Sequence, residues 1–452
     1  MSAAIELAVA RLGRVVDTSL ERCANLDLPP IQGKLTRLVG LTLQAAGCGG
    51  AVGDGCKVIA SDGQQIDAEI VGFSSDTTYL MPIGDARGLQ LGARVVPAKS
   101  VQHALVGEGL LGRIVGGNGE PLDGRGALAC AETASIFGSS INPLLRSPIN
   151  EPLDVGVRAI NSLLTVGKGQ RLGLFAGSGV GKSVLLGMMS RYTSADVIVV
   201  GLIGERGREV KEFVDNILGP EDRKRAIVVA TPADQSPLMR LHGAWLATCY
   251  AEYFRSRGKH VLLLMDSLTR FAQAQREIGL AIGEAPATKG YPPSVFARLP
   301  QLVERAGLGA GGDGSITAFY TVLTEGDDLQ DPIADAARAI LDGHIVLSRS
   351  LADSGHFPAI DIEASISRVM TEIVPNEQLQ LARELRQLIA THRHHQDLVA
   401  IGAYKEGVDA RLDRALRLWP SIQHFLQQDV SIAANRRESS LALRKLLETD
   451  GD

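Results

Sequence analysis

The sequence predicts a multidomain α/β protein with a small N-terminal β-barrel, a central P-loop (RecA-like) parallel-sheet core and a C-terminal α-helical domain. Short segments with a two-residue apolar period and frequent turn residues come first. Continuous apolar runs then alternate with helical stretches, and after Pro375 only helical periodicity remains. We therefore expect an N-terminal extension over 1–22, the barrel over 23–95, the core over 96–375 and the helical domain over 376–452.

The N-terminal extension has the pattern of a short amphipathic helix over residues 3–16. Its apolar positions recur at helical spacing, at Ile5, Ala8, Val9, Leu12 and Val16. Such a helix either docks on a partner or remains a frayed or self-packed terminus.

The barrel is predicted from several short alternating segments. "KLTRLVGLTLQA" alternates through four apolar residues, Leu35, Val39, Leu41 and Leu43. "CKVIASDGQQIDAEIVGF" is typical of two strands around an Asp62-Gly63 turn, and "TTYLMPIG" follows it. Short strands with turn signals at close spacing favour a small closed barrel.

Six apolar runs in the central part indicate buried parallel strands. They are residues 171–176, 196–205, 226–231, 260–266, 315–323 and 344–349. The segment "REVKEFVDNIL" between two of these runs places Val210, Phe213, Val214 and Ile217 on one helical face. Strands that alternate with helices and are apolar throughout predict a parallel sheet covered on both sides.

Beyond Pro375 the sequence predicts helices only. Asn376 is expected to cap a helix whose apolar stripe includes Leu379, Leu385 and Ile389. A similar pattern runs past Pro420. The cluster "THRHH" lacks a completing ligand pattern, so we expect a solvated helix end and no metal site, and we expect Trp245 and Trp419 to be core residues.

Composition limits the class of protein. The chain has 452 residues, a net charge of −5 and 45% hydrophobic residues, so a basic nucleic-acid surface is not indicated. Its five cysteines form no CxxC pair, which favours reduced thiols in the cytoplasm. No run reaches the ~18 apolar residues that cross a bilayer, and the start is a poor signal peptide. We expect a soluble cytoplasmic protein that can still dock on a membrane machine.

A glycine-rich octet, A-G-S-G-V-G-K-S, follows the run 171–176 and opens a helix. Its first position is Ala176 where the strict P-loop pattern has glycine. The loop would surround phosphates with backbone N–H groups, Lys182 would reach the β- and γ-phosphates, and Ser183 would bind Mg²⁺. The predicted nucleotide-binding residues here are Gly177, Ser178, Gly179, Val180, Gly181, Lys182, Ser183 and Val184. The second stretch, "GLGAGGDG" (307–314), precedes a strand instead of following one, so we expect a loop there.

Two carboxylates end neighbouring apolar runs. Asp266 ends "HVLLLMD" and is predicted to help hold Mg²⁺, with an ordinary helix cap as the alternative. Glu205 ends "DVIVVGLIGE" and is predicted to polarise the attacking water, with a surface ion cluster as the alternative. Both would face the phosphates, since the carboxyl ends of parallel strands meet at one sheet edge.

Several motifs resemble a known family over nearly the whole chain. "GLFAGSGVGKS", "GLIGERGREV", "MDSLTRFAQAQREI", "ATKGYPPSVFARLPQLVERAG" and "PAIDIEASIS" look like the catalytic-type subunits of rotary ATP synthases and their relatives in type III secretion. Within that superfamily, "VGVRAINSLLTVGKGQR" and the ending "DLVAIGAY…LWPSIQHFLQQ" are most similar to flagellar protein export ATPases.

The resemblance implies roles for further residues. It implies that Glu205 is the catalytic glutamate and that Arg368 is an arginine finger for a neighbouring subunit's site, with a structural salt bridge as the alternative for Arg368. It implies that Phe357 stacks on adenine, with a core position as the alternative, and that Arg206 approaches the γ-phosphate. ATP and Mg²⁺ are the implied cofactors, and a homohexamer is implied because the finger comes from the next chain.

The family pattern also implies partners and leaves alternatives. The implied partners are a stator-like subunit at the N-terminus, a central-stalk-like subunit, export gate membrane proteins and chaperone–cargo complexes, at the cytoplasmic face of the inner membrane. The main alternative is the ATPase of a virulence injectisome; a proton-coupled ATP synthase subunit fits less well. An RNA-translocating helicase would need an RNA-binding fold with exposed basic and aromatic residues at the N-terminus, but residues 23–95 have no aromatic-rich stretch and are not basic overall, so no nucleic-acid partner is expected. A ring subunit that binds ATP without turnover is disfavoured by Glu205.

Overall fold

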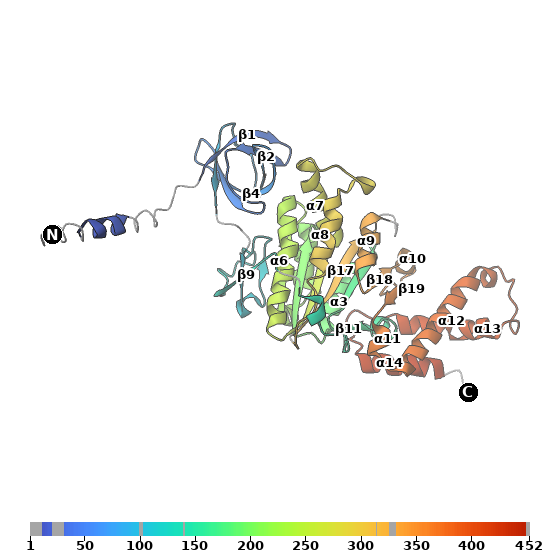
Figure 1. The fold of residues 1–452 in the computed structure, drawn as a ribbon. Helices are drawn as coiled ribbons and strands as arrows, with labels where there is room; N and C mark the ends of the chain where they lie inside the picture. Colours follow the sequence, from blue (N-terminus) through green and yellow to red (C-terminus); the bar gives the residue numbers. More distant parts are fainter. Residues whose placement is uncertain are drawn as a thin grey trace. The chain divides into compact units, whose positions relative to one another are not determined.

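The computed structural model describes residues 11–19, 31–98, 103–138, 141–312, 314–324 and 331–448. The chain divides into two compact units, Met1–Lys99 and Ser100–Asp452 (Figure 1). The first unit carries a barrel, and the second carries a large sheet together with the C-terminal helices. This architecture confirms the predicted fold class, while the domain limits given above stay predictions.

Six antiparallel strands close the N-terminal barrel in the order β1-β2-β5-β4-β3-β6. They are β1 (Gly33–Val39), β2 (Thr42–Ala46), β3 (Gly55–Ile59), β4 (Gln65–Ser74), β5 (Thr77–Pro82) and β6 (Arg94–Pro97). Inward-facing residues such as Val58, Ile70 and Val95 form one apolar core. Before the barrel, residues 11–19 form an exposed helical stretch, and the earlier part of the predicted helix lies outside the described residues.

The alternating segment "KLTRLVGLTLQA" is a hairpin. Strand β1 ends at Val39 and β2 begins at Thr42, and these two residues pair with each other. Gly40 has φ +56°, a left-handed conformation that glycine adopts most easily, and it turns the chain. As a result Val39 and Leu41 are exposed at the turn, although their spacing matches the buried positions.

The second unit contains a nine-stranded sheet with the order β19-β18-β12-β17-β15-β13-β14-β8, and β16 pairs with β17. Its strands are β8 (Ile114–Val115), β12 (Arg171–Ala176), β13 (Val197–Ile203), β14 (Ala226–Thr231), β15 (His260–Asp266), β16 (Gly307–Leu308), β17 (Ser315–Leu323), β18 (Gly343–Leu347) and β19 (Ile360–Ser367). The strands from β8 to β18 along this order run parallel, and the edge strand β19 runs antiparallel to β18. The six predicted apolar runs therefore all form strands of one sheet.

Helices cover this sheet, and two small sheets flank it. The helical elements of this part are η1 (Glu108–Leu110), η2 (Pro143–Leu145), α2 (Arg158–Leu163), α3 (Lys182–Tyr192), α4 (Gly207–Glu212), η3 (Phe213–Ile217), α5 (Pro220–Arg223), α6 (Pro237–Ser256), α7 (Leu268–Ala281), η4 (Thr288–Gly290), α8 (Pro293–Val303), α9 (Pro332–Ile340), α10 (Arg349–Asp353) and α11 (Met370–Ile373). The small sheets pair β7 (His103–Val106) with β9 (Glu132–Ser135) and β10 (Pro152–Leu153) with β11 (Val166–Gly167). Helix α6 packs on β13, β14 and β15 and against α7 (Figure 1). The loop expected over 307–314 is wrong at its start, because Gly307 and Leu308 form β16 and pair with β17. Gly309–Gly312 belong to no helix or strand, although Ala310 makes an isolated bridge with Arg146.

Three helices form the C-terminal region: α12 (Asn376–Ala400), α13 (Ala410–Leu426) and α14 (Arg436–Glu448). The prediction that Asn376 caps α12 is wrong, because Pro375 occupies the N-cap position and Asn376 is already helical. Trp245 is buried as expected, whereas Trp419 is only partly buried and stacks on His392 with ring centroids 3.6 Å apart. Within the described ranges no group of ligating side chains forms a metal site. None of the helices described has both the length and the apolar composition to span a bilayer.

Candidate functional site

The glycine-rich loop connects the central strand β12 to helix α3. Gly179 and Gly181 have φ +78° and +86°, left-handed values that a side chain would disfavour. Gly181 is the N-cap of α3 and provides no side chain, so the first N–H groups of the helix are not capped by one. Unsatisfied N–H groups at a helix N-terminus favour an anion, so this loop geometry is compatible with the predicted phosphate loop.

The predicted loop residues differ in exposure. Gly177 and Val180 are buried, Ser178, Gly179 and Val184 are exposed, and Gly181, Lys182 and Ser183 are intermediate. Ser183 is the second residue of α3, directly after Lys182. In this position its hydroxyl lies one residue beyond the lysine, as Mg²⁺ binding by a P-loop requires.

Lys182 lies between two acidic side chains. Its Nζ donates to Asp266 Oδ1 at 2.6 Å and lies 3.6 Å from Glu205 Oε1. Burial alone would lower the pKa of Lys182, but the charges of Asp266 and Glu205 outweigh burial and raise it. The lysine is therefore held protonated and directed at the site by the two carboxylates.

Sheet register explains why these carboxylates meet. Leu202 of β13 pairs with Asp266 of β15, and Glu205 follows the end of β13. Asp266 is buried and also accepts a hydrogen bond from Thr321 on β17 at 2.6 Å. Sequence reasoning missed Thr321, because the run 315–323 also contains Ser315 and Thr317 and nothing in the sequence singles out Thr321.

Glu205 is the least satisfied group of the site. Its Oε1 is buried and has no hydrogen-bond partner among the described residues, and 3.6 Å to Lys182 is too long for a hydrogen bond. Burial, together with the charge of Asp266, raises the pKa of Glu205 to about 7. A buried carboxylate oxygen of this kind can accept a hydrogen bond from a water or a ligand.

Phe357 lies beside the phosphate loop. A Cβ added at Gly181 would be 3.4 Å from a carbon of its ring, and 43% of Phe357 is exposed. This exposure argues against the core alternative. The Phe357 carbonyl accepts a hydrogen bond from the backbone of Gln428 at 3.0 Å, which ties the segment to the C-terminal region.

The two predicted arginines are not brought to the same place. The Arg206 side chain is 81% exposed and lies 3.5 Å from Glu209, so it takes part in the surface ion pair that was the alternative interpretation of this region. Arg368 follows β19, and its guanidinium donates to the Arg338 carbonyl at 3.2 Å. Within the described part of the chain, neither arginine makes a hydrogen bond or ion pair with the phosphate loop of its own chain.

Mg-ATP fits these residues. Near the N-terminus of α3, Oε1 of Glu205 is a buried acceptor to which no described residue donates, and the glycines at positive φ add no side chains to the loop. Ser183 and Asp266 are the residues that would hold Mg²⁺, which commonly keeps waters and phosphate oxygens and needs no full protein cage. Bound Mg²⁺ would neutralise phosphate charge during transfer.

The fold and site define the class as a P-loop nucleotide hydrolase. Residues 156–367 match the ATP synthase alpha/beta family, nucleotide-binding domain, and residues 374–445 match the T3SS EscN ATPase C-terminal domain. A Flagellum-specific ATP synthase of Pseudomonas aeruginosa is 59% identical, with 93% of this chain and 94% of that relative covered. The chain therefore belongs to the family of flagellum-specific ATP synthases and type III secretion ATPases.

Solved structures agree with this family. The assembled ATPase EscN from the enteropathogenic E. coli type III secretion system is 44% identical, has a TM-score of 0.88, and covers 92% of this chain and 100% of its own. EscN in complex with its central stalk EscO gives 43% identity, a TM-score of 0.84 and the same two coverages. The chain is accordingly an ATP-hydrolysing enzyme of the protein-export type.

Proposed function

We propose that this chain hydrolyses Mg-ATP in a homohexameric ring and thereby energises protein export through the flagellar type III apparatus. The observation that carries the proposal is the Lys182–Asp266–Glu205 cluster at the phosphate loop, in which Glu205 has an unsatisfied buried oxygen. Glu205 holds and polarises the attacking water, Lys182 binds the β- and γ-phosphates, and Ser183 and Asp266 hold Mg²⁺. Phe357 stacks on the base.

The position of Arg368 supports action on a neighbouring subunit. Ser367 pairs with Gly343 at the start of β18. Strand β18 runs parallel to β12 and begins beside the start of β12, so Arg368 lies near the amino end of β12. The phosphate loop follows the opposite end of β12, so about 13 Å or more of strand separates Arg368 from it. Arg368 therefore serves as a finger in trans, which requires a ring. Arg206 makes a lesser contribution near the γ-phosphate, for which its exposed side chain would have to move.

Identity favours the flagellar pathway. The chain is 59% identical to the flagellar relative named above and 44% identical to EscN.

The partners are a stator-like regulator at the N-terminus, a central-stalk-like subunit, the export gate and chaperone–cargo complexes, at the cytoplasmic face of the inner membrane. EscN with its stalk EscO supports the stalk proposal and keeps an injectisome ATPase as the second candidate. We propose no nucleic-acid partner, and nucleic-acid-stimulated ATP hydrolysis would contradict this.

Swimming in soft agar tests the pathway. A deletion strain of the native host is complemented with the wild type or with Glu205→Gln. We expect the wild type to restore swimming and Glu205→Gln to fail at equal protein level. Normal swimming of the deletion strain would overturn the flagellar assignment and favour the injectisome, and full rescue by Glu205→Gln would overturn the assigned role of Glu205.

A further inference from the structure

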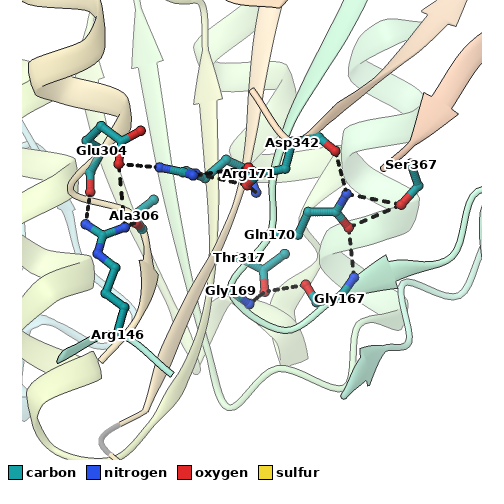
Figure 2. A network of polar contacts seen from close by, with 10 residues as sticks. All are labelled: Arg146, Gly167, Gly169, Gln170, Arg171, Glu304, Ala306, Thr317, Asp342 and Ser367. Atoms are coloured by element: carbon teal, nitrogen blue, oxygen red, sulfur yellow. Dashed lines mark hydrogen bonds and ion pairs between the residues drawn. The ribbon is translucent and has the colours of Figure 1, made fainter. Parts of the chain in front are cut away.

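A polar cluster lies at the amino end of β12, away from the phosphate loop. Figure 2 shows Gln170, Arg171, Asp342 and Ser367 linked by hydrogen bonds, with Glu304 and Arg146 to one side. These first four residues, called here the basal network, come from the start of β12, the turn before β18 and the end of β19. The network thus joins the strand that leads to the phosphate loop with the strand that ends at Arg368.

Arg171 and Asp342 form its charged half. Arg171 Nε and Nη2 donate to the two carboxylate oxygens of Asp342 at 2.9 and 3.1 Å, and the Arg171 backbone N–H donates to the same carboxylate at 3.0 Å. Arg171 Nη1 also pairs with Glu304 at 2.6 Å. Burial would lower the pKa of Arg171, but Asp342 and Glu304 raise it. The fork geometry fixes both the position and the orientation of Asp342.

Gln170 and Ser367 form its neutral half. Gln170 is fully buried, and its amide donates to Ser367 Oγ at 3.1 Å and to the Asp342 carbonyl at 3.2 Å. Ser367 Oγ donates in turn to the Thr165 carbonyl at 2.8 Å. The side-chain oxygen Oε1 of Gln170 accepts from the Gly167 N–H at 2.9 Å. Each polar group of this buried pair therefore has a partner, as a specific polar cluster requires.

Arg368 is held by this network at its backbone. Its N–H donates to the Asp342 carbonyl at 3.1 Å, the same oxygen that Gln170 contacts, and the preceding residue is Ser367. At the same level β18 and β19 approach closely, because a Cβ added at Gly343 would lie 2.5 Å from the Ile366 carbonyl oxygen. The Arg368 side chain itself is exposed. The backbone of Arg368 is fixed by the network, and its exposed guanidinium lies against α9, where it donates to the Arg338 carbonyl.

We infer that the basal network positions Arg368 for the active site of the neighbouring subunit. Gln170, Arg171, Asp342 and Ser367 are positioning residues; they touch no nucleotide and act through the backbone of Arg368. Apolar side chains would stabilise this strand end about as well as buried polar pairs do. The four polar residues are therefore explained better by a need to hold Arg368 in a fixed position than by stability. This inference rests on the proposed function of Arg368 in trans.

Mixed rings separate this role from support of the chain's own site. Differently tagged Glu205→Gln and Arg368→Ala chains are co-assembled and purified through both tags. The Glu205→Gln chain donates an intact finger, and the Arg368→Ala chain supplies an intact site. Random mixing makes about a quarter of the interfaces productive, since each interface is head-to-tail. ATP hydrolysis above that of either chain alone reports finger delivery. If the parent mixture recovers no activity, the proposed finger fails, and this inference fails with it.

Asp342→Asn or Ser367→Ala is then added to one chain at a time. On the finger-donating Glu205→Gln chain, we expect recovered activity to fall between about 10- and 100-fold, as for a small misplacement of a reacting group. On the Arg368→Ala chain, we expect recovered activity to change less than twofold. Ser367→Ala removes one hydroxyl and keeps the inference testable if Asp342→Asn fails to fold.

Glu151→Gln serves as the matched control. It removes a more exposed ion pair with Lys168, 2.8 Å long, near the same sheet end and without contact to Arg368. We expect it to leave recovered activity unchanged on either chain. An equal or larger loss when the network change is on the Arg368→Ala chain would assign the network to its own chain's site and overturn the inference. No loss on either chain would overturn it as well.

Discussion

The two ends of strand β12 differ in how their polar groups are satisfied. At the carboxyl end, Glu205 Oε1 is buried and none of the described residues hydrogen-bonds to it, and the N-cap Gly181 offers no side chain. At the amino end, Gln170 and Asp342 make hydrogen bonds through every side-chain group that the basal network uses. The comparison teaches that the carboxyl end (the incomplete end) keeps a buried carboxylate oxygen free to accept a donor. At the amino end (the complete end) the amide of Gln170 and the carboxylate of Asp342 are hydrogen-bonded, and Arg171 Nη1 is held by its ion pair with Glu304.

Lys182→Ala should produce the largest effect. Removing the cation from the incomplete end should reduce kcat/KM for ATP by at least about 10³-fold, because no other group replaces it on the phosphates. The chain should stay folded, since Asp266 keeps its bond to Thr321. ATPase kinetics and thermal melting check both, with Lys224→Ala, from an exposed pair with Glu221, as control. Collapse of the nucleotide-free melting temperature would make Lys182 structural and break the comparison.

Glu205→Gln should lower turnover and raise the free energy of unfolding. Turnover should fall about 10²- to 10⁴-fold through loss of the base. The pKa of Glu205 is about 7 in the folded chain, above its ordinary value of 4.5. Between these two pH values the folded state keeps a proton that the unfolded state has lost, so stability falls as the pH rises, and the full penalty is present above pH 7. Glutamine removes this penalty, which should raise the free energy of unfolding at pH 8 by about 1–3 kcal/mol and by less at pH 5. Denaturant unfolding at both pH values checks this, and a destabilised variant at pH 8 would contradict it.

The pH dependence of the wild type should follow the same carboxyl group. As a base Glu205 must be ionised, and its pKa is raised to about 7 by burial and by Asp266. We expect kcat/KM, which reports the free enzyme, to fall about tenfold per pH unit below that value. Initial rates from pH 5.5 to 8.5 at constant ionic strength would measure it. A flat profile down to pH 5.5 would show that the free enzyme holds Glu205 ionised.

Asp342→Asn should show the smallest change within a single chain, a loss of stability at the complete end. Losing the charge opposite Arg171 should lower the free energy of unfolding by about 1–3 kcal/mol, the range for a charged hydrogen bond. Urea unfolding with an unchanged m-value would attribute this loss to stability alone. Glu151→Gln is again the control and should change stability by less than about 0.5 kcal/mol. Equal effects of the two variants would erase the contrast between the strand ends.

The sequence predicts the site at the carboxyl end of the strands, but it does not predict the basal network at the amino end of β12. The runs ending in Asp266 and Glu205 are apolar throughout, so their strands and the edge where they meet follow from periodicity and sheet topology. Neither Thr321 nor the basal network could be predicted, because the sequence does not tell which residue of a neighbouring strand lies opposite a given polar residue. The wrong cap at Asn376 has a local cause, since Pro375 takes the N-cap place.

Strand β19 has a consequence for the proposed ring. Phe357 precedes it beside its own phosphate loop, and Arg368 follows it at the opposite end, across a strand of eight residues that spans about 27 Å. Between Asp361 and Ile366 the strand bulges relative to its partner β18. Under the proposed action of Arg368 in trans, one edge strand carries both the residue beside the base of one active site and the residue offered to the next, so a displacement of this strand would move groups of two active sites.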